Sequence, residues 1–287
     1  MCAQSRKDSE GGESGMLRKG LGFTWIGVVF VVALLVAFEG AADWKVYVAA
    51  DLGISGSTVD TDGAVTSGIR VRFAGSDTDA SPLISGAVGI EIPMDELLPR
   101  EWIVGDVRLP DWPVRFELEG AGLREYEFST VGGSGDKFFT EVKSATMFYN
   151  TWVDVPMTSA YAPIQYLLGL GRQPRLRRLL DPASLYFGVG IGFHATEFDG
   201  TTNAIDASDD VVDFAWNAGA GLSYALTDRV SLSAGYRYVG LGEQTIDFDS
   251  SSAAPISSGD DVEFDPEIHE FRVQLRVRVF NFLSPWR

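Results

Sequence analysis

Two side chains capable of nucleophilic chemistry lie two positions apart in the segment LYFGVGIGFHATEF. His194 and Thr196 would share one face of a strand formed there, because successive side chains alternate between its faces. A histidine beside a hydroxyl is the arrangement of a general base and its nucleophile. The nearby carboxylate, Glu197, falls on the opposite face. A histidine within a polar network is the simpler interpretation, so we predict no catalytic residue and no enzymatic activity.

Acidic clusters suggest a second kind of chemistry, the binding of divalent cations. They are the runs DTDG from Asp60, SDTD from Ser76, DASDD from Asp206 and SSGDDVEFD from Ser257. None has the ligand spacing of an EF-hand loop. Solvated surface charge is the default interpretation of such runs. We therefore predict neither a metal site nor a cofactor site.

Charge and cysteine content exclude two further features. The 287 residues carry a formal net charge of −17, which argues against nucleic acid as a partner because phosphate binding needs clustered Lys and Arg. Cys2 is the single cysteine, so an internal disulfide cannot form.

The N-terminus has the organisation of an export signal. Arg18 and Lys19 precede an apolar run over residues 23–38 and small residues at 40–42, as in a secretory signal peptide. An uncleaved membrane anchor is the alternative, because the length of the run lies between those of the two kinds of segment. We expect three regions: a disordered extension or upstream start over 1–15, a signal peptide over 16–42 and a mature domain over 43–287.

The mature domain contains eight segments of about ten residues in which large apolar residues alternate with small or polar ones. No helix-length apolar run follows residue 38, so this domain would cross a membrane only as strands, and a closed barrel satisfies every backbone group in lipid. The predicted fold is therefore all-β, an eight-stranded antiparallel transmembrane β-barrel of up-and-down topology. The segments are 44–55, 83–92, 113–128, 143–156, 185–198, two within 214–240 joined by a tight turn at 227–229, and 269–280.

The two faces of these segments differ in chemistry. We expect the apolar face to meet lipid and the small face to fill the narrow interior of an eight-stranded barrel. Trp152 falls on the inner face, where it either plugs the lumen or marks an error in the phase. A soluble β-sandwich is the alternative fold. The inner face also gathers a nearly balanced set of charges, which should pair across the lumen because buried charges need partners: Lys45, Asp51, Glu91, Arg115, Glu117, Glu119, Asp154, Asp213, Arg237, Arg272, Arg276 and Arg278.

The connections between segments are of two kinds. Those rich in Asp, Ser, Thr and Gly are predicted to be long loops on the outer side, over 57–82, 129–139, 198–211 and 243–266. Two connections on the inner side, 93–112 and 156–183, are longer than the usual turns. The second contains YLLGLG close to four arginines, which suggests either a short helix at the lipid headgroups or a long turn.

In order and spacing, these segments resemble the eight-stranded outer-membrane β-barrel proteins of Gram-negative bacteria, the porin-family group that includes opacity-type surface proteins and the membrane domain of OmpA. The resemblance covers about residues 44–280 and rests on YVAADLG, PVRFELEG, NTWVD, LYFGVGIGF, AWNAGAGLSYALTDRVSLSAGYRY and HEFRVQLRVRVF. It implies export to the bacterial outer membrane. Family members end on an aromatic residue that the barrel-assembly machinery reads; here NFLSPWR follows Phe280, so Phe280 or Phe282 is the candidate signal.

The resemblance implies no single activity, because one fold hosts many functions. We expect a structural or surface-interaction protein that acts through acidic extracellular loops, with a lumen plugged by side chains. The expected partners are outer-membrane lipid and lipopolysaccharide, whose phosphates divalent ions could bridge to the acidic loops, together with host or surface ligands of unknown identity. The alternative is a narrow channel or a carrier of small hydrophobic molecules. The third hypothesis is a lipid-modifying enzyme, because some outer-membrane barrels are lipid A deacylases with His and Ser two residues apart.

Overall fold

A computed structural model describes residues 44–67, 69–97, 110–131, 137–159, 178–201, 206–242, 244–247 and 261–282. Within the compact unit Asp43–Leu283 lie all of the described residues. The predicted extension and signal peptide, 1–15 and 16–42, lie outside the described residues. No helix in the described part of the chain is both long and apolar enough to cross a membrane.

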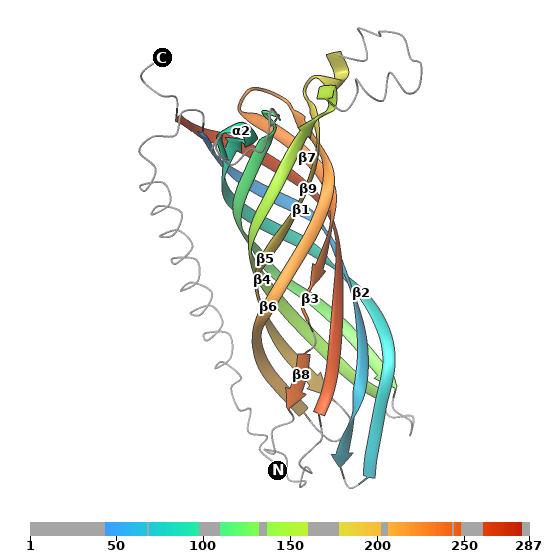
Figure 1. The fold of residues 1–287 in the computed structure, drawn as a ribbon. Coiled ribbons are helices and arrows are strands. Elements are labelled where there is room, and N and C mark those ends of the chain that lie inside the picture. Colours follow the sequence, from blue (N-terminus) through green and yellow to red (C-terminus); the bar gives the residue numbers. More distant parts are fainter. Residues whose placement is uncertain are drawn as a thin grey trace, which may run out of the picture. The chain divides into compact units, whose positions relative to one another are not determined.

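Nine strands form one antiparallel sheet, which dominates the fold (Figure 1). A short helix, α2 (Met94–Leu97), follows the second strand. The strands are β1 (Trp44–Ser67), β2 (Ile69–Pro93), β3 (Pro113–Val131), β4 (Lys137–Pro156), β5 (Ala183–Thr201), β6 (Asp206–Ala225), β7 (Val230–Gly240), β8 (Gln244–Asp247) and β9 (Asp261–Phe282).

Eight of these strands close into a barrel. Their order is β1-β2-β3-β4-β5-β6-β7-β9, and β9 pairs back onto β1. The four-residue strand β8 pairs with β9 alone and is not a ninth strand of the closed barrel. The predicted eight-stranded antiparallel barrel is thus confirmed, and the β-sandwich alternative is wrong.

The register of the ladders fixes the stagger of the barrel. Paired residues lead around the wall from Lys45 to Ser55 through Glu91, Arg115, Trp152, Gly188, Gly219, Arg237 and Glu270. Ser55 lies ten residues beyond Lys45 on β1. With eight strands, this stagger corresponds to a strand tilt of about 40° and an interior that side chains can fill.

The facing of the strands follows the predicted alternation. On β5, Val189 is 61% exposed, whereas His194 is buried inside. Between them, a Cβ added at Gly190 would collide with the amide groups of Asn150 and Asn217, so the glycine makes room for these lumen side chains. Trp152 is buried in the interior, which settles its phase in favour of a lumen position.

The first predicted long loop, 57–82, is strand apart from residue 68, which lies outside the described residues, so this part of the prediction was wrong. The segment 57–82 continues β1 to Ser67 and β2 from Ile69, paired throughout. Strand residues likewise extend into 129–139, 198–211 and 243–266. The alternation of apolar residues marks only the part of each strand whose outer face is apolar. Backbone hydrogen bonds of the ladder continue beyond it, through Asp, Ser and Thr, wherever the neighbouring strand keeps the register.

The two inner connections are described only near their ends. The segment 93–112 contains α2, and 156–183 has helical turns at 157–159 and 178–180. The predicted headgroup helix around YLLGLG lies outside the described residues.

A buried ionic network as the candidate functional site

Glu119 on β3 is the centre of a network inside the barrel. Its side chain is fully buried and receives Arg237 Nη1 at 2.8 Å and Arg272 Nη1 at 3.1 Å. Asn150 Nδ2 donates a third bond of 2.9 Å. The two arginines, on β7 and β9, reach Glu119 across the lumen, whereas Asn150 lies on the neighbouring strand β4. Together the three donors satisfy a carboxylate that burial would otherwise penalise.

Both arginines also hold a second carboxylate. Arg272 Nη2 lies 2.6 Å from Asp51 Oδ1 on β1, and Arg237 Nη2 lies 2.6 Å from Glu270 Oε2 on β9. Glu270 in turn contacts Arg124 Nη2 at 2.5 Å. The result is an alternating chain of buried charges, named here the charge chain: Asp51, Arg272, Glu119, Arg237, Glu270 and Arg124.

A second cluster lies nearer to the ends of β3 and β4 at Pro113 and Pro156. Arg115 Nε contacts Asp154 Oδ2 at 3.0 Å, and Arg115 Nη1 is also paired with Glu117. Arg276 Nη1 approaches the same Asp154 oxygen at 3.4 Å. Tyr47 Oη donates a 2.7 Å bond to Glu117. Each charge in this cluster therefore has an opposite partner.

Aromatic rings surround the guanidinium groups of this cluster. Arg115 Cζ lies 5.5 Å from the ring centre of Tyr186 and 6.0 Å from that of Trp152. Trp152 Nε1 also donates a 3.0 Å bond to Glu117. Cation–π contacts of this kind gain strength where water is excluded, and the rings occupy volume that water would otherwise fill.

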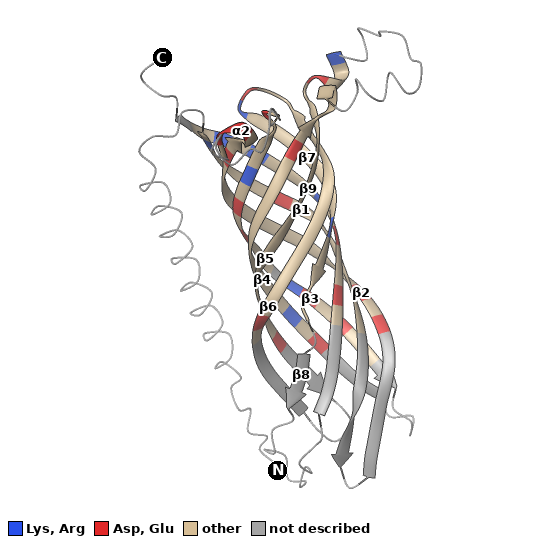
Figure 2. Cartoon of the chain, viewed as in Figure 1, with Lys and Arg blue, Asp and Glu red and all other residues tan. Residues whose placement is uncertain are grey.

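The end of the barrel at Trp44 and Phe282, here the proximal end, holds a third and wetter cluster. Glu91 contacts Lys45 Nζ at 3.1 Å and Arg278 Nη2 at 3.0 Å. Lys45 is 37% exposed. Arg278 Nη1 also donates 2.8 Å to the Asp228 carbonyl, which ties this cluster to the β6–β7 turn. Figure 2 shows basic and acidic positions interspersed along the described barrel wall.

The predicted inner charges are placed in these clusters with one exception. The exception is Asp213, which is exposed and lies opposite His194 in the β5–β6 ladder. It is a member of none of the three clusters. Sequence reasoning missed Glu270 and Arg124. Glu270 shares the parity of Arg272 and could have been found by extending the pattern two residues. Arg124 could not, because a bulge between Ala121 and Arg124 reverses the facing of β3.

His194 and Thr196 both point into the barrel and are buried. The threonine hydroxyl therefore does not face lipid, where a lipid-modifying nucleophile would have to act. Within the described residues, no group of His, Cys, Asp and Glu side chains is arranged to hold a metal ion.

The candidate assembly residues lie at the end of β9. Phe280 is exposed on the outer face and is paired with Val46, and Phe282 is paired with Trp44 as the last strand residue. The side chain of Phe282 is outside the described set.

Comparison with known proteins identifies one family. The family described as "Outer membrane protein beta-barrel domain" matches residues 26–265. No curated protein matches the sequence.

Solved structures give three comparisons. Neisserial surface protein A (NspA) is 18% identical with a TM-score of 0.34, over 84% of this chain and 100% of that one. The outer membrane protease OmpT from Escherichia coli is 8% identical with a TM-score of 0.42, over 84% and 99%. Ail, the attachment invasion locus protein of Yersinia pestis, is 13% identical with a TM-score of 0.33, over 81% and 99%.

Proposed function

Since the chain belongs to the family of outer membrane protein beta-barrel domains, we propose that it is a non-enzymatic surface protein of the bacterial outer membrane. In this proposal its lumen is closed by side chains, and its acidic outer end makes contacts with partners. Export depends on a cleaved signal peptide over 16–42, and assembly depends on recognition of Phe280 or Phe282 by the barrel-assembly machinery.

The charge chain is the observation that carries this proposal. It runs from Asp51 on β1 through Glu119 on β3 to Arg124 beyond the β3 bulge, using partners on β7 and β9. Every side chain in it is at most 6% exposed. Continuous ion flow would need a water-filled path through the lumen, whereas these charged groups form their hydrogen bonds with each other.

The burial of His194 and Thr196 inside the wall supports the non-enzymatic assignment. A lipid-modifying site needs a nucleophile and a base that reach the substrate. Both of these side chains face away from the lipid side of β5.

The end of the barrel opposite the proximal end is called the distal end here. We assign the contacts with partners to this distal end. Its strands continue through Asp-rich sequence, including DTDG in β1 and DASDD in β6. Such a surface would engage lipopolysaccharide phosphates through divalent cations, or basic groups on a host or surface ligand directly.

Conductance of the refolded protein in planar bilayers tests the closed lumen. The double variant Glu119→Ala/Arg237→Ala is the informative one, because it leaves Asp51 paired with Arg272 and Glu270 paired with Arg124. We expect no steady conductance from the unmodified protein and discrete openings from the double variant. Val189→Ala, on the outer face, is the matched control and should stay silent.

Steady openings in the unmodified protein would contradict the proposal and favour the narrow channel. The carrier alternative rests on a different observation, an apolar cavity beyond the charge chain.

A further inference from the structure

The barrel wall divides into two sheets towards the distal end. The β2–β3 ladder ends at Ser85 and Ala121, and the β6–β7 ladder ends at Trp216 and Gly240. Beyond these points, residues 69–84 of β2 pair with β1 alone, and residues 206–215 of β6 pair with β5 alone, among the described strands.

A glycine turn produces the second division. Gly240 pairs with Glu267 and Gln244 pairs with Phe264, so β8 takes the place of β7 along β9 after an irregular step. Gly242 within that step has φ of 75°, a left-handed conformation that glycine adopts without strain. In the described strands β8 pairs with β9 and makes no ladder with β6.

The distal half is therefore built of two four-stranded leaves. The first leaf consists of β8, β9, β1 and β2, and the second of β3, β4, β5 and β6. Below them, near the charge chain, the leaves are joined by the Arg124–Glu270 ion pair and by a 2.6 Å bond between Ser55 Oγ and Tyr126 Oη.

Side chains bridge the seam between β2 and β3. Asp79 Oδ2 accepts the backbone N–H of Glu127 at 2.8 Å, and Asp77 Oδ2 accepts that of Ser129 at 2.8 Å. Ser81 Oγ accepts the N–H of residue 125 at 3.1 Å. These single bonds can open one at a time, whereas a backbone ladder opens cooperatively.

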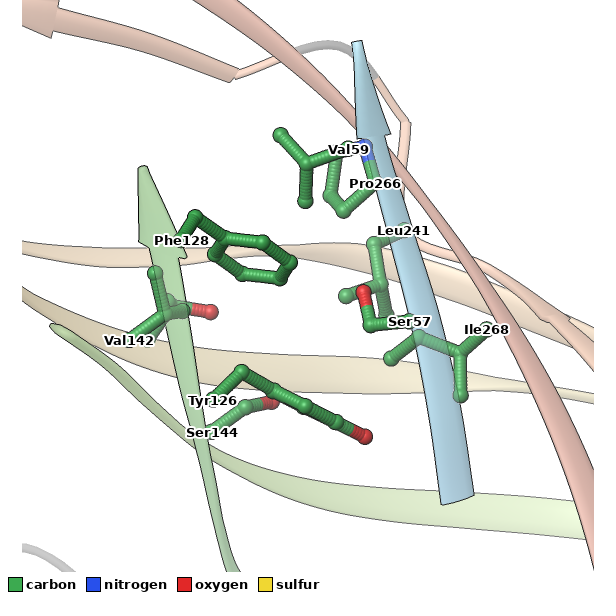
Figure 3. A pocket seen from close by; sticks show the side chains of 10 residues that line it. Ser57, Val59, Tyr126, Phe128, Val142, Ser144, Leu241, Pro266 and Ile268 are labelled. Atoms are coloured by element: carbon green, nitrogen blue, oxygen red, sulfur yellow. The ribbon is translucent and has the colours of Figure 1, made fainter. Parts of the chain in front are cut away.

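An apolar cavity of about 20 Å³ lies between the leaves (Figure 3). Val59 and Ile268 reach it from the first leaf, and Phe128 and Val142 from the second. None of the described residues that line it is charged. Its volume suits one water-sized group, so a larger occupant requires the leaves to part.

Four buried side chains with hydroxyl groups also line the cavity: Ser57, Tyr126, Ser144 and Thr196. Ser144 on β4 and Thr196 on β5 lie opposite each other in the ladder. They are 1% and 3% exposed, and neither hydroxyl has a hydrogen-bond partner among the described residues. Buried polar groups are normally satisfied, because an unmade hydrogen bond costs stability. The hydroxyls of Ser144 and Thr196 thus offer an unsatisfied hydrogen-bonding point in a largely apolar space.

We propose that the two leaves part along their seams to bind a neutral, largely apolar small molecule that carries one hydroxyl group, such as a medium-chain alcohol. The apolar walls take the hydrocarbon, and Ser144 and Thr196 bond the hydroxyl. A carboxylate or ammonium would enter without a counter-charge, which the cavity penalises. The site lies beyond the charge chain, so binding does not require the lumen to conduct.

Photolabelling locates such a ligand. The full chain in lipid vesicles is exposed to octanol that carries a diazirine, and the labelled residues are identified by mass spectrometry. We expect saturable labelling at residues 126–128 and 142–144. Unlabelled 1-octanol should compete, and octanoate should compete at least about ten-fold less well because its charge is unpaired in the cavity.

Variants then test the hydroxyls. Thr196→Val keeps the size of the side chain and should weaken competition by 1-octanol about five-fold, and Ser144→Ala/Thr196→Val should weaken it further. Thr151→Val, on the outer face of β4, is the matched control and should change nothing. Heat-dependent gel mobility verifies that each barrel has closed.

Two results would overturn the proposal. Labelling confined to outer-face residues such as Phe187 and Val189 would mean that octanol merely partitions around the barrel. Cavity labelling that 1-octanol fails to displace, or that octanoate displaces equally well, would mean that no selective site exists. Both comparisons use the unmodified protein, so they do not depend on the folding of a variant.

Discussion

The charge chain makes a quantitative prediction for the pair Glu119 and Arg237. Removing Glu119 alone, as Glu119→Leu, leaves Arg237 and Arg272 to share Asp51 and Glu270, which already has Arg124 as a partner. Breaking a buried pair costs about 3–5 kcal/mol. Because both arginines keep one carboxylate partner, we expect about 3 kcal/mol.

Removing Arg237 alone, as Arg237→Met, leaves two carboxylates with one arginine each. Glu119 keeps Arg272, and Glu270 keeps Arg124, while the middle of the chain gains one unbalanced negative charge. We again expect about 3 kcal/mol. The double variant restores the balance, since two complete pairs remain. Its cost should also be about 3 kcal/mol or less, which gives a coupling free energy of at least about 3 kcal/mol.

Equilibrium unfolding in urea, followed by tryptophan fluorescence in lipid vesicles, measures these free energies. Glu141 and Lys143 form the matched control, because their 2.9 Å pair is substantially exposed. The same cycle there should give a coupling of only about 0.2–1 kcal/mol. Additivity within about 0.5 kcal/mol at Glu119 and Arg237 would refute the reasoning, since it would mean that the two side chains are energetically independent.

Three further predictions follow from the outer face, the seam and the strand end. Val189→Arg should lower the free energy of unfolding by about 2–4 kcal/mol if the site lies near the bilayer midplane, whereas Val189→Leu should be tolerated; equal urea midpoints would contradict this facing. Asp79→Ala should speed hydrogen exchange of the Glu127 amide about ten-fold, and Asp79→Asn, which keeps an acceptor, should have a smaller effect; unchanged exchange in the alanine variant would exclude the bridge. Phe280→Ala should slow assembly in cells more than Phe271→Ala, measured as the heat-modifiable fraction over time; equal rates would exclude Phe280 as the signal.

Local pattern was enough to predict the facing of the strands. On β5, glycines alternate with large apolar residues, and the structure exposes the large apolar residues while the glycines are buried or half-buried. Such alternation has a period that no helix can satisfy. The count of eight barrel strands followed from the same pattern, because each segment is long enough to be recognised separately.

Contacts across the lumen could not be predicted from local pattern. Glu119 meets Arg237 across 118 positions of sequence, and which inner residues meet depends on the stagger summed around all eight strands. The bulge before Arg124 adds a single residue that reverses the parity of the rest of β3. The extent of the strands could not be predicted for a different reason: in the segments taken for loops, Asp, Ser, Thr and Gly interrupt the regular alternation of large apolar residues that marks the rest of each strand.

The polar interior also bears on how such a chain reaches its membrane. A sequence whose strands were apolar on both faces would be hydrophobic enough to enter a lipid bilayer as helices. Here the mean hydropathy of the whole chain is only +0.05, and the charged and polar inner residues keep the unfolded strands compatible with water. Closing the barrel then removes those same charges from water, and each needs a partner at that moment. An apolar replacement of both Glu119 and Arg237 would leave the remaining charges of the folded barrel paired, but it would remove two of the charges that keep the unfolded strands hydrated. The charge chain thus reconciles two opposing demands on one set of residues, hydration before folding and complete pairing after it.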